Sequence, residues 1–345
     1  MSLQSVCLFR LSALGDVTHV LPVIQILRAR WPEVRITWVV GKLEARLVAG
    51  VPDVELIAID RKHILKSRRD LHAQLRGRRF DALLLMQVSL RAGVIATAVP
   101  AVRRIGYPRS RSKELHGWFV NEHLPEQQCP HVLDQLLAFA HHLGAPQQPP
   151  LWDLPIPDEA HAFAQSHLPG SQPTLVISPC SSHTARNWSI AGYAALAIHA
   201  LSRGFRVALV GGPSELERRT ADAIQSAAGG RLIDLVGKDT LKQLLAVLKR
   251  ADIVVSPDSG PAHFANAVGT PTIALHAATD PRRSGPYANL ANSIDAFDRA
   301  ARTFRGKSGD QLPWGTKIEQ PGVMDLITIT EVLQRFDEVA ARVLG

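Results

Sequence analysis

The stretch "SVCLFRLSALGDVTHVLPVIQILRARWPEVRITWVV" (residues 5–40) sets the pattern of the whole chain. A short apolar run, residues 6–11, leads into a turn that contains Gly15 and Asp16. A segment with apolar residues at helical spacing follows, ends near Pro32 and gives way to a second apolar run. Strand, helix and strand in this order predict two parallel strands joined by a crossover helix.

The same alternation of short apolar runs and longer amphipathic segments continues through all 345 residues. It is interrupted by a proline-rich stretch, residues 145–173, which is typical of a connection between domains. The expected strands cover residues 6–11, 35–40, 54–59, 81–86 and 103–107 before this stretch, and 174–179, 206–211, 231–236, 252–257 and 271–276 after it. The pattern predicts an α/β protein with two Rossmann-like domains.

We expect an N-terminal domain over residues 1–165 and a C-terminal domain over residues 166–327. Residues 328–345 form a final helix that begins at Thr328 or Thr330 and could pack back on the N-terminal domain. Ligands of open α/β sheets bind outside the carboxyl ends of the strands. The two parallel sheets are therefore expected to face a central cleft that holds the substrates.

The formal net charge of +8 indicates an anionic partner, such as nucleic acid, an acidic membrane surface or a phosphorylated substrate. Residues 61–113 alone contain fourteen Lys or Arg and two Asp, so the positive charge belongs to the N-terminal half. A merely solubilising surface would mix both signs. Nucleic acid is disfavoured because the stretch contains only two of Phe, Tyr or Trp, Phe80 and Tyr107, and no recognised nucleic-acid module. We expect an anionic acceptor or a membrane there, with Arg61, Lys62 and Arg91 as acceptor-binding candidates.

The three cysteines, Cys7, Cys129 and Cys180, lie far apart, which argues against a zinc site or a disulfide framework and fits a reducing compartment. The first residues lack the basic start of a signal peptide. No run of about 18 uncharged apolar residues occurs. These features predict a soluble cytoplasmic protein that can touch a membrane.

The segment "ISPCSSHTARNWS" (residues 177–189) follows an expected strand. The hydroxyl and backbone N–H groups of Ser181 and Ser182 could hold phosphate oxygens, and Arg186 adds a fixed positive charge. The alternative is an ordinary polar loop in which Ser189 caps the next helix.

The segment "SPDSGPAH" (residues 256–263) turns from a strand into a helix rich in small residues. Ser259, Gly260 and the free amides of that helix would face an anion or sugar hydroxyls. The alternative is a capped turn with Asp258 or Ser259 as N-cap. His263 could bond a phosphate or have a structural role.

The segment "LVGGPSELER" (residues 209–218) places Glu215 just beyond a strand, where a carboxylate can bind ribose hydroxyls. Neither GxGxxG nor a GxxxxGK[ST] phosphate loop occurs, which disfavours nicotinamide, flavin and P-loop chemistry. No DxD pair or HExxH motif is present. A bound diphosphate would then be neutralised by Arg186, backbone amides and helix dipoles rather than by a metal.

Two long segments carry a family resemblance: "LFRLSALGDVTHVLPVIQILRARWPEVRITWVV" and "DIVVSPDSGPAHFANAVGTPTIALHAATDPRRSGPY". They resemble glycosyltransferase family 9, the ADP-heptose:lipopolysaccharide heptosyltransferases. The resemblance implies a GT-B fold, with the acceptor on the N-terminal domain and the nucleotide sugar on the C-terminal domain. It implies an inverting, metal-independent transfer with no cofactor, from a nucleotide sugar, ADP-heptose, to an anionic glycolipid of the lipid A–Kdo type.

The resemblance also implies a role for each site residue. Asp16 corresponds to the general base, Glu215 to the ribose-binding acid and Asp258 to the sugar-binding acid. The residues that correspond to the diphosphate site are Ser181, Ser182, Arg186, Ser259, Gly260 and His263. The family's adenine pocket falls near Lys238 and Asp239.

Other functions remain open at this level. A family member could use another nucleotide sugar for a different surface polysaccharide. A sugar-nucleotide epimerase can share the two-domain plan, but it would have no use for a basic N-terminal surface. A non-catalytic nucleotide-binding protein would leave Asp16 unexplained. For the transferase, we expect a cytoplasmic location with peripheral, electrostatic contact to the inner membrane.

Overall fold

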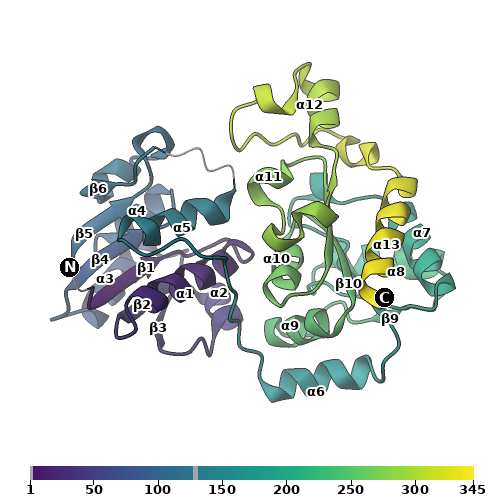
Figure 1. Cartoon of the computed structure of the whole chain (residues 1–345), viewed down its shortest axis with the longest axis horizontal. Coiled ribbons are helices and arrows are strands. Elements are labelled where there is room, and N and C mark those ends of the chain that lie inside the picture. Colours follow the sequence, from purple (N-terminus) through teal and green to yellow (C-terminus); the bar gives the residue numbers. More distant parts are fainter. Residues whose placement is uncertain (1–2, 127–130) are drawn as a thin grey trace. The chain divides into compact units, whose positions relative to one another are not determined.

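The structure is a computed structural model that describes residues 3–126 and 131–345. The chain divides into two compact units, Met1–Pro155 and Ile156–Gly345, and most of their helices and strands are labelled in Figure 1. None of the helices in the described ranges has the length and apolar character that crossing a bilayer requires.

The first unit contains one parallel sheet with the strand order β3-β2-β1-β4-β5-β6. The strands are β1 (Ser5–Phe9), β2 (Arg35–Gly41), β3 (Val54–Ile59), β4 (Phe80–Leu85), β5 (Ala101–Gly106) and β6 (Glu122–His123). The helices and 3-10 turns are η1 (Asp16–His19), α1 (Val20–Arg30), α2 (Lys42–Val48), α3 (Ile64–Gln74), α4 (Leu90–Ala96), η2 (Arg109–Arg111), η3 (His116–Phe119) and α5 (Val132–His142). The crossover predicted between the first two strands is therefore present.

The central strand β1 is buried along its whole length, as expected for a parallel sheet covered on both faces. Cys7 and Phe9 point to one face, where they pack in one core with Leu71 of α3 and Ile95 of α4. Helices α1 and α5 pack against each other separately from this core. Side chains that follow β1 and β4 are thus fixed by a rigid framework.

The second unit repeats this topology with the strand order β12-β11-β10-β7-β8-β9. Its strands are β7 (Thr174–Ile177), β8 (Arg206–Leu209), β9 (Ile233–Asp234), β10 (Ile253–Pro257), β11 (Thr272–His276) and β12 (Ile294–Asp295). Its helices are α6 (Asp158–His167), α7 (Ile190–Ser202), α8 (Glu215–Ala227), α9 (Leu241–Arg250), α10 (Gly260–Ala267), α11 (Pro281–Ser284), α12 (Phe297–Arg305) and α13 (Ile329–Leu344). Its 3-10 turns are η4 (Thr184–Arg186), η5 (Tyr287–Asn292), η6 (Gly309–Gln311) and η7 (Val323–Leu326).

All ten expected strands are present in the two sheets, although their ends differ by a few residues. The sequence pattern missed β6 and β12, which are outer strands of two residues each and do not lie in an apolar run. The equally short β9 was predicted because it lies inside the apolar run 231–236. Two Rossmann-like units, each with one parallel sheet, are the architecture expected of a GT-B fold.

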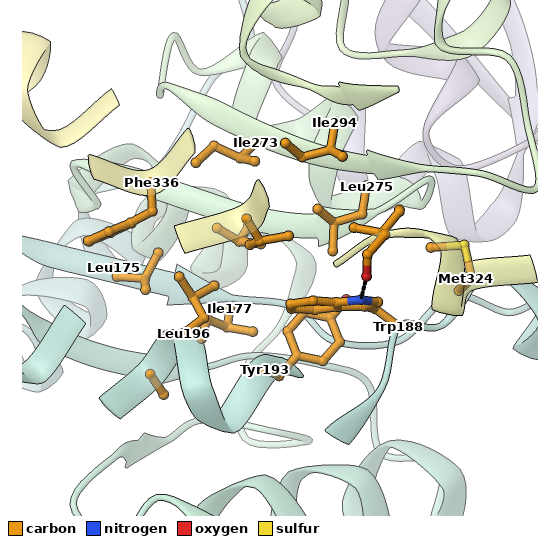
Figure 2. Close-up of a cluster of buried hydrophobic side chains, with 14 of the residues drawn as sticks. Leu175, Ile177, Trp188, Tyr193, Leu196, Ile273, Leu275, Ile294, Met324 and Phe336 are labelled. Carbon is orange, nitrogen blue, oxygen red and sulfur yellow. Dashed lines mark hydrogen bonds between the residues drawn. The ribbon is translucent and has the colours of Figure 1, made fainter. Parts of the chain in front are cut away.

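The final helix belongs to the second unit, which differs from the expectation that residues 328–345 pack back on the N-terminal domain. Helix α13 packs on α7, and its residues Val332, Phe336 and Val339 join the core of the second unit (Figure 2 draws Phe336). Burying each such side chain stabilises the fold by roughly 1.5–3 kcal/mol. Of the two predicted caps, Thr328 is the one used, in a capping box with Glu331.

The boundary between the units falls after Pro155, ten residues before the expected end of the N-terminal domain. The physical reason is α6, which lies inside the proline-rich stretch and packs on α9 of the second unit. Its Ala160 and Ala164 are buried in that contact region. The connection is therefore shorter than residues 145–173.

Candidate active site

The strand order of the first unit reverses between β1 and β4, and the crevice at such a reversal is where open α/β sheets bind ligands. Asp16 follows β1 at this point, in the first turn of η1. Its Oδ2 accepts a hydrogen bond from Arg10 Nη2 at 2.6 Å and one from the Ala13 N–H at 3.3 Å. The Asp16 side chain is 32% exposed, so it can meet a substrate.

Arg10 is a buried cation that the sequence reasoning missed. Its guanidinium also donates to the Met86 carbonyl, which follows β4 and accepts a second hydrogen bond from the Tyr107 hydroxyl. Burial alone would lower the pKa of Arg10, but the Asp16 carboxylate and the Tyr107 hydroxyl together oppose burial, and the pKa is raised. Asp16 is therefore held in place by a permanent charge at the end of two neighbouring strands.

The predicted acceptor residues Arg61, Lys62 and Arg91 lie around one cavity of about 360 Å³ in the first unit. The other lining residues are Leu11, Ser12, Gln87, Ser89, Ala92 and Ile95. Arg61 is held by an ion pair with the buried Glu44 at 3.0 Å. Three cations at one polar cavity can bind an acceptor that carries carboxylates or phosphates.

The basic stretch 61–113 is not one continuous surface, because several of its arginines serve the fold. Arg104 donates to the backbone carbonyls of Phe119, Val99 and Ala96, and burial lowers its pKa. Arg78 and Arg103 form ion pairs with Glu55 and Glu122. The charge available to a ligand is therefore smaller than the count in the sequence.

In the second unit, the strand order reverses between β7 and β10, and an ion pair spans this position. Arg186, in η4 after β7, lies 3.2 Å from Asp258, which follows β10. The two side chains are only 13% and 9% exposed. The other amino group of Arg186 lies 3.6 Å from Glu319. A cation between two carboxylates can exchange a carboxylate for a diphosphate oxygen.

Glu319 comes from the segment between α12 and η7, in which the sequence analysis names no site residue. It also lines a cavity of about 340 Å³ beside η4. The other lining residues are Thr184, Ala185, Asn187, Gln320, Pro321, Gly322, Val323, Met324 and Asp325. A single carboxylate in an irregular loop gives no sequence signal, so only the fold could reveal it.

The loop that carries Arg186 is fixed by the residues after it. Trp188 is buried against Tyr193, and its indole N–H donates to the Ile327 carbonyl at 2.9 Å (Figure 2). The Asn187 side chain accepts the Ser181 N–H at 2.7 Å. Ser189 caps α7 by accepting the Gly192 N–H. The polar-loop interpretation and the ligand interpretation are thus compatible at this segment.

The two adjacent serines differ in their surroundings. Ser181 is buried, and its hydroxyl accepts the His183 N–H at 3.3 Å, so both its N–H and its hydroxyl already serve the loop. Ser182 is exposed. Ser182 is therefore the better placed of the pair to donate to a phosphate.

The strand–helix turn at Asp258 leaves backbone donors for a ligand. Ser259 occupies the N-cap position of α10, but its side chain makes no capping bond and lies 2.8 Å from the Ser256 hydroxyl. The first amides of α10, which begins at Gly260, are thus not satisfied by a cap. His263 is buried in this helix. Burial lowers the pKa of His276, the last residue of β11, and the Asp258 carboxylate opposes that shift.

Glu215 is the first residue of α8, with a side chain 77% exposed and paired with Arg219 one turn later. Its exposure leaves it accessible to a ligand. Glu217, which the sequence reasoning did not single out, instead points toward the loop of Gly211 and Gly212, which we term the glycine loop. Glu217 accepts the Gly212 N–H at 2.7 Å and the Ser214 hydroxyl at 2.6 Å, and so shapes that loop.

Asp239, near the expected adenine pocket, lies in the loop between β9 and α9. Burial raises the pKa of its carboxyl to about 7, and the nearby Glu217 adds to the shift. One carboxyl oxygen of Asp239 is buried without a hydrogen-bond partner among the described residues. The carboxyl is therefore half-protonated near neutral pH.

We expect the Asp239→Asn variant to be more stable than the original chain at pH 8, and to show a smaller difference at pH 5. The folded-state pKa of about 7 lies above the ordinary value of 3.8, so folding favours the protonated form. Stability is consequently lost as the pH rises from about 4 to about 7, and asparagine has no such loss. Each 1 kcal/mol gained in the free energy of unfolding should raise Tm by about 2–4 °C for a unit of this size.

The measurement is Tm at both pH values by scanning calorimetry. Glu159→Gln on the exposed face of α6 is the matched control, since it also replaces an acid by its amide in the second unit. An equal change in Tm at pH 5 and pH 8 for Asp239→Asn would contradict the prediction.

The thiols of Cys7 and Cys180 are free and buried, whereas Cys129 lies outside the described residues. Burial raises the pKa of the Cys180 thiol. In residues 3–126 and 131–345, no cluster of three or more His, Cys, Asp or Glu side chains is arranged to hold a metal ion.

Comparison with known proteins agrees with this architecture. Glycosyltransferase family 9 (heptosyltransferase) matches residues 68–310. The lipopolysaccharide core heptosyltransferase OpsX of Haemophilus influenzae is 38% identical over 330 residues, which cover 96% of this chain and 95% of that protein. Lipopolysaccharide heptosyltransferase 1 of Pseudomonas aeruginosa is 28% identical and covers 82% of this chain and 81% of its own length.

Two solved structures share the fold. The family 9 glycosyltransferase of Veillonella parvula has a TM-score of 0.82 at 20% identity and covers 99% of both chains. The Escherichia coli heptosyltransferase WaaC, solved with ADP, has a TM-score of 0.73 at 21% identity and covers 98% of this chain and 100% of its own. On the family match and the full-length similarity to OpsX, this chain belongs to glycosyltransferase family 9, the heptosyltransferases.

Proposed function

We propose that this enzyme transfers a heptose from ADP-heptose to the inner core of lipopolysaccharide, with inversion at C1 and without a metal ion. The similarity to a lipopolysaccharide core heptosyltransferase over 96% of the chain is the observation that carries the proposal. The ADP in the WaaC structure supports an adenine nucleotide as donor. The polar residues at the β1–β4 and β7–β10 reversals support separate roles for the two units. The second unit binds the donor, and the first unit binds the acceptor and supplies the base.

The second unit holds the donor in this proposal. Arg186 moves from its carboxylate partners to the diphosphate, joined by the Ser182 hydroxyl and the first amides of α10 at Ser259 and Gly260. His263 and Ser181 complete the surroundings of the diphosphate. Glu215 binds the ribose, and Asp258, released from Arg186, binds sugar hydroxyls. These groups stabilise the negative charge that develops on the leaving ADP.

The first unit supplies the base and the acceptor. The acceptor hydroxyl attacks C1 of the donor from the face opposite the diphosphate, and Asp16 takes its proton as the bond to C1 forms. The bond from C1 to the diphosphate oxygen breaks through a transition state that resembles an oxocarbenium ion, whose positive charge the carboxylate also stabilises. Arg61, Lys62 and Arg91 bind the acidic groups of a lipid A–Kdo acceptor.

The acceptor defines where the reaction takes place. A lipid A–Kdo acceptor is anchored in a bilayer, so we propose a cytoplasmic enzyme at the cytoplasmic face of the inner membrane. Contact with the membrane is peripheral and electrostatic. Nucleic acid is not a partner in this proposal.

A transfer assay tests the proposal directly. The full chain is incubated with ADP-, GDP- or UDP-sugars, with and without lipid A–Kdo, and products are followed by mass spectrometry. We expect a heptosylated acceptor with ADP-heptose, and release of ADP that depends on the acceptor. Transfer of a different sugar would favour another surface polysaccharide. An isomerised sugar formed without any acceptor would favour an epimerase and overturn the proposal.

A charge-reversal pair tests the acceptor site in the same assay. We expect Lys62→Glu combined with Arg91→Glu to raise KM for lipid A–Kdo by about tenfold or more, because each lost charged contact weakens binding by roughly 1.5–3 kcal/mol. KM for the donor should be unchanged. The matched control is Arg76→Glu combined with Arg79→Glu, which makes the same charge change on exposed residues that do not line the cavity. Equal effects of both pairs would remove the cavity from acceptor binding.

A further inference from the structure

Four large apolar side chains of the first unit are exposed on or next to α3, α4 and η3, and α4 supplies part of the lining of the acceptor cavity. Trp118 is 81% exposed, Leu65 78%, Leu115 49% and Leu90 45%. Single exposed apolar residues are common on protein surfaces and need no explanation. These four, which we term the apolar rim, come from α3 (Leu65), α4 (Leu90), η3 (Trp118) and the residue that precedes η3 (Leu115). A group of exposed apolar side chains on elements that pack together marks an interaction site.

The packing of α3, α4 and η3 brings the rim together. Helix α3 packs on α4, with Arg68 Nε donating to the Thr97 hydroxyl at 2.8 Å. Helix α4 packs on η3, and Gly93 leaves room for the Phe119 ring, since a Cβ there would lie 2.2 Å from it. The Leu90 N–H donates to Glu114, the residue before Leu115, at 2.9 Å.

Positive charges outnumber negative ones in the segments that carry the rim, which include the exposed Glu114. Lys62, Lys66, Arg91, Arg109 and Lys113 are exposed. None of these five forms an ion pair with another residue in the described part of the chain. Exposed leucine and tryptophan bordered by cations is the composition that binds the interface of an anionic bilayer, where tryptophan prefers the headgroup level.

The rim also borders the acceptor cavity. Arg61 and Lys62, which line the cavity, are separated by His63 alone from α3, whose first turn carries Leu65. Arg91, which also lines it, follows Leu90 directly. A glycolipid whose acyl chains lie in a bilayer touching the rim would therefore present its sugars at the cavity.

We propose that the apolar rim inserts into the interface of an anionic bilayer and seats the acceptor cavity on the membrane. This inference rests on the proposed function for the identity of the acceptor. It goes beyond electrostatic attraction, because the apolar side chains supply part of the binding free energy and set which side of the first unit faces the lipid.

The test is co-sedimentation with sucrose-loaded vesicles, without donor or acceptor. We expect the full chain to bind vesicles of phosphatidylcholine and phosphatidylglycerol in equal amounts, and not phosphatidylcholine alone. The double variant Leu65→Ser, Trp118→Ser should partition about tenfold or more weakly, because two apolar side chains no longer leave water. Both side chains are mostly exposed, so Tm should be unchanged.

The matched control is Ile198→Ser combined with Leu216→Ser, two exposed apolar residues of the second unit that should leave vesicle binding unchanged. A second readout is transfer. The rim variant should lose activity on lipid A–Kdo embedded in vesicles and keep it on the same acceptor freed of acyl chains. Equal loss on both acceptors would overturn the proposal.

Other outcomes are also decisive. Vesicle binding by the rim variant at the level of the unmodified chain would overturn the inference. So would a dimer that dissociates on the rim substitutions, measured by sedimentation velocity, because the rim would then join two copies. If the unmodified chain transfers to neither acceptor but the rim variant still loses vesicle binding, the proposed function fails and the rim remains supported.

Discussion

Replacing Asp16 with asparagine is expected to lower turnover by about 10²- to 10⁴-fold, the usual contribution of a well-placed general base. Asparagine has almost the same shape and still accepts hydrogen bonds through its Oδ1, so the contacts with Arg10 and the Ala13 N–H can persist. It cannot accept the proton of the attacking hydroxyl. Binding of ADP, which we assign to the second unit, should be unchanged.

The measurements are initial rates of heptose transfer, ADP binding by calorimetry, and Tm. Tm separates a catalytic loss from an unfolded first unit, because Arg10 is only 11% exposed and loses its charged partner in this variant. Asp53→Asn is the matched control, an exposed residue of the same unit at φ 48°, which asparagine tolerates. Turnover near that of the unmodified enzyme would exclude Asp16 as the base.

The alternation of apolar runs was sufficient to predict both parallel sheets, because buried parallel strands leave continuous apolar segments in the sequence. It did not identify the unit to which α13 belongs. The pattern marks the apolar face of that helix, including Phe336, but it does not name the surface that the face covers. For the same reason, α6 inside the proline-rich stretch moved the boundary to Pro155.

The sequence could place polar residues at the ends of strands: Asp258 follows β10 directly, and Arg186 lies in the loop between β7 and α7. Their role in binding the donor stays a prediction. Partners that arrive from distant segments were not predictable. Glu319 reaches Arg186 across more than a hundred residues of sequence, and Arg10 contacts Asp16 only because of the turn that follows β1. The direction in which a side chain points was equally unpredictable from the sequence. Glu215 and Glu217 are two residues apart on α8, yet one is exposed and the other closes the glycine loop.

The second large effect is expected at Arg186. The Arg186→Ala variant should bind ADP about 10²-fold or more weakly, because the diphosphate loses a charge-assisted fork of donors. The loss is larger than for an isolated cation, since Asp258 and Glu319 would then meet the diphosphate as uncompensated negative charges. Calorimetric titration with ADP measures the change.

Two further variants distinguish a ligand role from a structural one. Arg186→Lys keeps the charge but loses the planar fork, so its affinity should lie between those of the original chain and the alanine variant. Adding Glu319→Gln to Arg186→Ala should recover part of the affinity by removing one of the two repelling carboxylates. A purely structural role predicts no such recovery, because glutamine restores no partner to Asp258.

The matched control is Arg299→Ala, another arginine of the second unit, which pairs with Glu331 at 2.7 Å near the N-terminus of α13. Its loss should change Tm at most slightly, as for other half-exposed ion pairs, and leave ADP affinity unchanged. The decisive comparison is ADP affinity in folded variants. If Arg186→Ala keeps a cooperative thermal transition and binds ADP as tightly as Arg299→Ala, the charge at the β7–β10 reversal does not hold the donor. The diphosphate would then have to be assigned to other groups of the second unit.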